Sequence, residues 1–140
     1  MNDYRFEDIS QGQTERFTRR ITGEMMEDFR ALTGDENPLH TDAEAARERG
    51  FKDRVSYGML TASMISTLAG MFLPGRNCLL MEVNSKFARP VYAGDELTVT
   101  GSVTKIDPIF RTIDVKTAIT NDRGEKVYRG SYRAGFFEEP

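Results

Sequence analysis

A run of 17 residues without a charged side chain, Tyr57 to Leu73 (YGMLTASMISTLAGMFL), limits the folds that this chain can adopt. A helix needs about 20 apolar residues to cross a bilayer, and this run is shorter and carries serine, threonine and glycine throughout. A helix that is apolar on all sides also occurs buried inside a soluble fold. We therefore expect a buried helix that starts near Ser56 or Tyr57 and stops at Pro74-Gly75, with no membrane as partner.

The first residues of the chain predict a strand and then a helix. Residues 13–21 are rich in β-branched and aromatic side chains and predict a strand. Thr22 can cap a helix over residues 23–33, in which apolar side chains recur at helical spacing until Gly34.

A loop and a second short helix precede the uncharged run. Pro38 disfavours a helical conformation in the residue before it, so we expect residues 34–40 to form a loop. Asp42 can cap a helix over residues 43–50, which ends at a glycine.

The second half of the chain predicts four strands separated by turns. Apolar and polar side chains alternate most clearly along residues 94–106 and 110–120, as expected of strands with one buried face. The expected strands cover residues 78–87, 94–106, 110–120 and 126–137, with turns at 107–108 and 121–124.

An antiparallel sheet curled around the long helix is the simplest structure in which this order of elements buries an apolar helix. This α+β arrangement is the hotdog fold. An α+β sandwich would fit the same order of elements, and the pattern alone does not separate the two. The length of 140 residues fits a single domain over residues 1–140.

Composition argues against several partners and cofactors. The net charge is −3 and no long basic run is present, which disfavours nucleic acid and anionic membranes as partners. With one cysteine, Cys78, and one histidine, His40, the chain cannot build a cysteine/histidine zinc site, and we expect no metal. The first ten residues, MNDYRFEDIS, are polar and acidic, unlike a secretory signal, so we expect a cytoplasmic location.

Asp35 and His40 are the side chains best suited to acid–base chemistry. His40 is the only histidine, and histidine is the side chain that serves most often as a general acid or base near neutral pH. Asp35 lies five residues before it, across Asn37-Pro38. In a loop, both side chains can turn toward one point, where a carboxylate and a neutral imidazole can hold a water and move its proton. Taken alone, the pair has a second interpretation, in which both residues only stabilise a loop.

Residues 33–46, TGDENPLHTDAEAA, closely resemble the hydratase motif of the MaoC-like and (R)-specific enoyl-CoA hydratase family. The matching positions are Thr33, Gly34, Asp35, Asn37, Pro38, Leu39, His40 and Ala46. Residues 57–63 (YGMLTAS) resemble the start of the family's central helix, and residues 87–97 (FARPVYAGDEL) resemble its strand–turn–strand. This resemblance extends over roughly residues 22–105 and implies the hotdog fold.

The resemblance implies reversible hydration of a trans-2-enoyl thioester, carried on CoA or acyl carrier protein, to the (R)-3-hydroxyacyl form without a cofactor. Asp35 and His40 would activate the water that attacks C3 and deliver a proton to C2. The amide of Gly58 would help to form an oxyanion hole, Ser63 would lie near the substrate, and Asn37 would support the site. Each of these three residues also has a structural interpretation: Gly58 in helix packing, Ser63 in a hydrogen bond to a helix carbonyl, and Asn37 in a turn. The resemblance also implies a homodimer or a larger assembly of dimers.

One position departs from the family, because Tyr57 stands where a histidine is common. Tyrosine keeps a hydrogen-bond donor but does not titrate near neutrality. Two other functions stay open at this point: a thioesterase, for which residues 56–73 lack the usual acidic residue, and a hotdog protein that binds an acyl group without turnover. The sequence does not indicate the acyl chain length, the carrier or the favoured direction.

Overall fold

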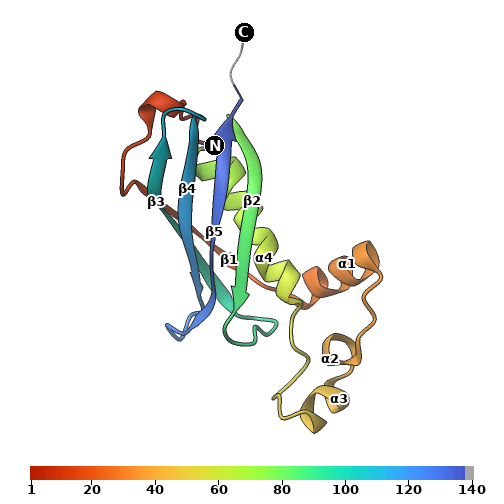
Figure 1. Cartoon of the computed structure of the whole chain (residues 1–140). Coiled ribbons are helices and arrows are strands. Elements are labelled where there is room, and N and C mark those ends of the chain that lie inside the picture. The colour runs from red at the N-terminus through yellow and green to blue at the C-terminus, as the bar shows by residue number, and fades with distance from the viewer. Residues whose placement is uncertain (138–140) are drawn as a thin grey trace.

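The computed structural model of the chain describes residues 1–137, so the last three residues of the domain expected over 1–140 lie outside the described part. Five strands form one antiparallel sheet in the order β1-β3-β4-β5-β2. Their bounds lie within two residues of those expected: β1 (Thr14–Arg20), β2 (Cys78–Phe87), β3 (Glu96–Asp107), β4 (Thr112–Thr120) and β5 (Lys126–Phe136). Figure 1 shows this sheet curling around one helix, which confirms the α+β hotdog arrangement.

The helices divide into a central helix and a group beyond the sheet. The central helix α4 (Gly58–Thr67) continues as a short stretch of π-helix, η2 (Leu68–Phe72), and stops before Pro74. Figure 1 shows three other helices projecting beyond the sheet beside the start of α4. They are α1 (Gly23–Thr33), α2 (Pro38–Thr41) and α3 (Ala43–Glu48), and a single 3-10 turn, η1 (Phe6–Asp8), lies near the N-terminus.

Capping residues start two of these helices where the sequence predicted. The Thr22 hydroxyl accepts a hydrogen bond from Met25 N at 3.1 Å, and the Asp42 carboxylate accepts from Glu44 N at 3.0 Å. Each bond satisfies an amide that has no partner within its own helix. Asp42 also follows the last residue of α2, so its cap fixes where the helical turn that carries His40 ends.

The prediction that residues 34–40 form a loop throughout is wrong at its end. One helical turn, α2, starts at Pro38 and includes His40. Proline fits the first position of a helix because that position needs no N–H, and the Asn37 side chain accepts a hydrogen bond from Leu39 N at 3.0 Å. Pro38 thus keeps residue 37 extended and at the same time begins a new helix.

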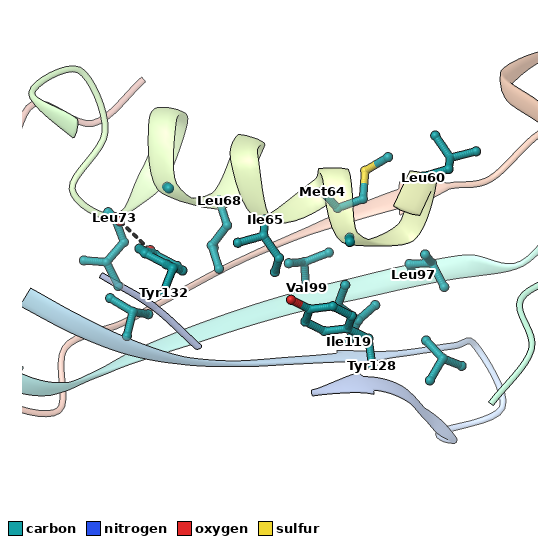
Figure 2. Packing of buried hydrophobic residues seen from close by; sticks show 14 of the residues in the cluster. Leu60, Met64, Ile65, Leu68, Leu73, Leu97, Val99, Ile119, Tyr128 and Tyr132 are labelled. Atoms are coloured by element: carbon teal, nitrogen blue, oxygen red, sulfur yellow. Dashed lines mark hydrogen bonds between the residues drawn. The ribbon is translucent and has the colours of Figure 1, made fainter. Parts of the chain in front are cut away.

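The core lies between α4 and the concave face of the sheet, as Figure 2 shows. Leu97 and Val99 of β3 are fully buried, and Ile65 of α4 is 1% exposed. Gly101 of β3 lets the helix approach closely, because a Cβ there would lie 2.8 Å from Leu68 Cδ2. The alternation predicted for β3 and β4 is confirmed: the apolar set faces the core in both strands.

The central helix is not buried on all sides, which corrects the prediction from its uniform apolarity. Leu60 and Leu68 face the core, whereas Met59 is 63% exposed and Met71 is 42% exposed. One curled sheet can cover only the side of a helix that faces it. Within residues 1–137, no helix is long and apolar enough to span a membrane.

Candidate functional site

A cleft of about 300 Å³ opens at the start of α4, where this helix meets the end of β2. It brings together segments that are far apart in the sequence: α2, the first turn of α4, the end of β2 and the start of β5. The lining residues are His40, Phe51, Val55, Ser56, Gly58, Thr61, Phe87, Ala88, Arg89, Pro90, Val91 and Val127. A larger cavity of about 810 Å³ lies at the opposite end of the sheet and is lined by none of the residues predicted for the site.

His40 is oriented by a backbone carbonyl. Its Nδ1 lies 2.7 Å from the carbonyl oxygen of Val55. Because a carbonyl only accepts hydrogen bonds, Nδ1 must carry a proton. In the neutral ring this leaves Nε2 without a proton, so the imidazole that lines the cleft can accept one from a water.

Tyr57 connects His40 to the loop of Asp35. The Tyr57 hydroxyl donates a hydrogen bond of 2.6 Å to the backbone carbonyl of Asp35, and its ring centroid lies 4.2 Å from that of His40. Burial, and to a smaller extent the negative charge of Asp35, raises the pKa of the Tyr57 hydroxyl. Tyr57 therefore stays protonated at neutral pH and serves as a hydrogen-bond donor rather than as a base.

Asp35 and Asn37 shape the loop before α2. Asp35 Oδ1 accepts a hydrogen bond from Asn37 N at 3.0 Å, which closes a tight turn. Asn37 in turn caps α2, so its structural interpretation is confirmed. Both residues are exposed, and Asp35 is linked to the cleft through Tyr57 rather than by lining it.

Gly58 is the first residue of α4 and lines the cleft. Its amide has no partner within the helix because the first turn of a helix leaves its N–H groups unpaired. A Cβ at this position would lie 3.2 Å from Cδ1 and Cε1 of Phe87. Gly58 thus permits close packing against β2 and also offers a donor at the positive end of a helix.

Ser63 does not join these residues. It lies on the exposed side of α4, and its hydroxyl donates a hydrogen bond of 2.6 Å to the carbonyl of Leu60. It is absent from the lining of the cleft as the described residues form it. Of the residues predicted from the sequence, the structure brings His40 and Gly58 into the cleft and places Tyr57 and Asp35 beside it.

Sequence reasoning missed most of the lining residues, among them Ser56, Thr61 and Phe87. Thr61 follows Gly58 by three residues, so helical spacing could have indicated that it shares a face with Gly58. Phe87 ends β2, and only the pairing of strands brings it to the helix. Ser56 and Thr61 are 3% and 2% exposed, and their hydroxyl oxygens have no hydrogen-bond partner within residues 1–137.

The cleft has one charged lining residue among those described, Arg89. Arg89 lines its mouth and forms an ion pair with Glu125 at 3.5 Å. Within the described residues, no group of three His, Cys, Asp or Glu side chains is placed to hold a metal ion. The cleft thus combines an oriented imidazole with the N-terminal residue of a helix, which suits proton transfer beside a developing negative charge.

Comparison with known proteins finds a family model and relatives that match this chain. The model of the MaoC like domain family matches residues 6–124. An (R)-specific enoyl-CoA hydratase of Rhodospirillum rubrum is 35% identical over 115 residues, which cover 82% of this chain and 80% of the relative. The (R)-specific enoyl-CoA hydratase of Aeromonas caviae is 37% identical over 95 residues, which cover 68% of this chain and 71% of the relative.

A solved structure shares the same fold over nearly the whole chain. The unliganded (R)-hydratase PhaJ1 of Pseudomonas aeruginosa superposes with a TM-score of 0.88 and 31% identity, covering 96% of this chain and 86% of that chain. The matched region contains both the hydratase motif and the central helix. The chain belongs to the MaoC-like domain family.

Proposed function

We propose that this chain, an enoyl-thioester hydratase and therefore a lyase of the MaoC-like family, adds water to its substrate in the cleft between His40 and Gly58. The observation that carries this assignment is the hydrogen bond from His40 Nδ1 to Val55 O, because it leaves Nε2 able to accept a proton inside the cleft. Gly58, the first residue of α4, lines the same cleft, and its amide is a suitable donor to the negative charge that develops on a thioester oxygen.

In the proposed reaction, a water oxygen bonds to C3 of the trans-2-enoyl thioester. His40 holds this water and accepts one of its protons, which then passes to C2 of the substrate, while Asp35 acts on the water from beside the cleft. Negative charge moves from the double bond onto the thioester oxygen, where the amide of Gly58 donates a hydrogen bond. The reverse sequence removes water from the (R)-3-hydroxyacyl thioester, and neither direction requires a cofactor.

Tyr57 acts as a positioning residue in this proposal. Its hydroxyl holds the backbone of Asp35, and its ring packs against His40. The tyrosine that replaces the family's common histidine therefore links the two catalytic groups without titrating. Asn37 supports them by closing the turn and capping α2. Ser63 would approach substrate only from the exposed side of α4.

The substrate is a thioester of CoA or of acyl carrier protein. Relatives include (R)-specific enoyl-CoA hydratases and a mitochondrial 3-hydroxyacyl-[acyl-carrier-protein] dehydratase of Arabidopsis thaliana. Arg89 lies at the mouth of the cleft, where it can meet a phosphate of either carrier. The cytoplasmic location expected from the sequence and the single domain over residues 1–140 are further proposals, testable by cell fractionation and by limited proteolysis.

A homodimer would cover the apolar surface that one chain leaves open. Strand β2 is an edge of the sheet, paired only with β5. Its side chains Leu80 and Val83 are 43% and 44% exposed, and Met59 on the neighbouring helix is 63% exposed. An unpaired apolar edge invites pairing with another chain, and a two-fold axis would use this surface twice. We propose that the second chain completes the acyl pocket.

Hydration of crotonyl-CoA, monitored as the loss of absorbance of the conjugated thioester, tests the function. We expect the purified protein to catalyse it, and longer or branched enoyl thioesters should follow if crotonyl-CoA is too short. Asp35→Asn and His40→Ala should each lower kcat by about 10²-fold or more, while Asp28→Asn, an exposed carboxylate on α1, should leave it unchanged.

Full activity in either catalytic variant would refute the site. Binding of enoyl thioesters without turnover would instead favour the non-catalytic hotdog protein. Hydrolysis to free CoA would indicate a thioesterase, which residues 56–73 disfavour because they contain no carboxylate.

A further inference from the structure

Four charged side chains form an ion-pair network beside the site, and the mechanism described above uses none of them. Arg30 Nε donates a hydrogen bond of 2.7 Å to the carboxylate of Glu36, and Arg30 also pairs with Glu27 at 3.5 Å. Glu27 pairs in turn with Arg54 at 3.0 Å. None of the four lines the cleft as the described residues form it. The ion-pair network therefore acts on the site only through the segments that carry it.

The two ends of the ion-pair network lie next to the two residues of the proposed acid–base pair or their supports. Glu36 directly follows Asp35. Arg54 directly precedes Val55, whose carbonyl oxygen accepts the hydrogen bond from His40. Neither end of the network belongs to a helix or a strand. The hydrogen bonds of regular secondary structure therefore do not fix the backbone at these two points, and the ion pairs tie both to a helix.

Helix α1 supplies the middle of the ion-pair network and so supports both loops. Glu27 and Arg30 lie three residues apart on this helix, a spacing that places them on the same side. Phe29 of the same helix packs its ring against that of Tyr57, with 4.8 Å between the ring centroids. The hydrogen bond from Arg30 lowers the pKa of Glu36, so the pair stays charged at neutral pH.

The exposure of these side chains limits what they contribute to the stability of the fold. The side chain of Arg30 is 37% exposed and that of Glu36 is 62% exposed. Exposed ion pairs contribute little to the free energy of unfolding, although several charges in a network contribute more than one isolated pair. Catalysis is more sensitive to position, because a displacement of about 1 Å can lower the rate by about 10²-fold. Weak restraints can therefore matter for turnover while the fold hardly depends on them.

We infer that the ion-pair network positions the catalytic pair, by holding the loop of Asp35 and the loop that orients His40 at a fixed separation on α1. This inference rests on the proposed hydratase function. It extends the site to residues that sequence reasoning did not indicate, because three of the four lie outside the hydratase motif and Glu36 is not among its matching positions. It predicts a loss of kcat with little change in KM, because the four side chains do not line the cleft.

The first test compares Arg30→Met, Glu36→Gln and their double variant with Arg20→Met. Arg20 of β1 forms an exposed ion pair with Glu96 at 3.1 Å, on the edge of the sheet opposite β2. In crotonyl-CoA hydration, each single variant should lower kcat by about 3- to 10-fold, the scale of one or two such ion pairs. KM should stay within about twofold. The double variant should lose little more than either single variant, because both substitutions break the same pair.

Arg54→Met tests the other end of the network and should lower kcat in the same range, whereas Arg20→Met should keep kcat unchanged. All four single variants should melt within a few degrees of the wild type, as expected for exposed ion pairs. A loss of kcat that only follows a loss of folded protein would overturn the inference. So would additive losses in the double variant, or a raised KM with kcat unchanged, which would assign these residues to substrate binding.

The wild-type protein separates the inference from the function on which it rests. An active wild type whose Arg30, Glu36 and Arg54 variants behave like Arg20→Met would overturn the inference alone. A wild type inactive on crotonyl-CoA and on longer or branched enoyl thioesters would overturn the hydratase function and this inference with it.

Discussion

Replacing Tyr57 by phenylalanine separates its hydrogen bond from its packing. The substitution removes only the hydroxyl that donates to Asp35 O at 2.6 Å and keeps the ring beside His40. One such bond contributes about 1 kcal/mol, which corresponds to about fivefold in rate if all of it acts in the transition state. Without this bond the Asp35 loop can also move, and a displacement of a catalytic group by about 1 Å can lower the rate by about 10²-fold. We expect kcat for crotonyl-CoA hydration to fall by about 5- to 100-fold with little change in KM.

Tyr132→Phe provides a matched control. Tyr132 is also 2% exposed, and its hydroxyl also donates to a backbone carbonyl, that of Leu73 at the far end of the central helix. Both variants should lower the melting temperature by a few degrees, as expected for about 1 kcal/mol in a chain of this size. Only Tyr57→Phe should lower kcat. If the two variants lose the same fraction of kcat, Tyr57 has no positioning role and the link between Asp35 and His40 is structural.

Three further outcomes are expected. Chiral analysis of the hydration product should find the (R)-3-hydroxyacyl thioester, and a dominant (S) product would exclude the proposed placement of Asp35 and His40. Mass photometry should find a dimer or an assembly of dimers, with Val83→Glu on the exposed β2 edge shifting the population toward monomer; an active wild-type monomer would contradict the shared site. Burial raises the pKa of Cys78 from about 9 to about 11, so the thiolate is scarce below pH 9 in the native protein. Alkylation of Cys78 at pH 8 should therefore be slow in the native protein and fast after unfolding. Equally fast alkylation in both states would show that the thiol is not protected.

Local interactions determined the parts of the structure that the sequence predicted well. Strands β3 and β4 follow the period-two alternation, and the caps Thr22 and Asp42 start α1 and α3 where expected. The hydratase motif made Asp35 and His40 the candidate pair because its spacing is contained within one short segment. Such signals depend on neighbouring residues, so no knowledge of the tertiary structure was needed to detect them.

Contacts between distant segments determined the remaining features of the site. The tautomer of His40 depends on the carbonyl of Val55, and the role of Tyr57 depends on the carbonyl of Asp35, 22 residues earlier. Phe87 reaches Gly58 only because β2 pairs with β5 at the edge of the sheet. The exposed side of α4 was also unpredictable, because hydropathy records how apolar a helix is, whereas the curvature and extent of the sheet decide how much of that helix one chain can cover.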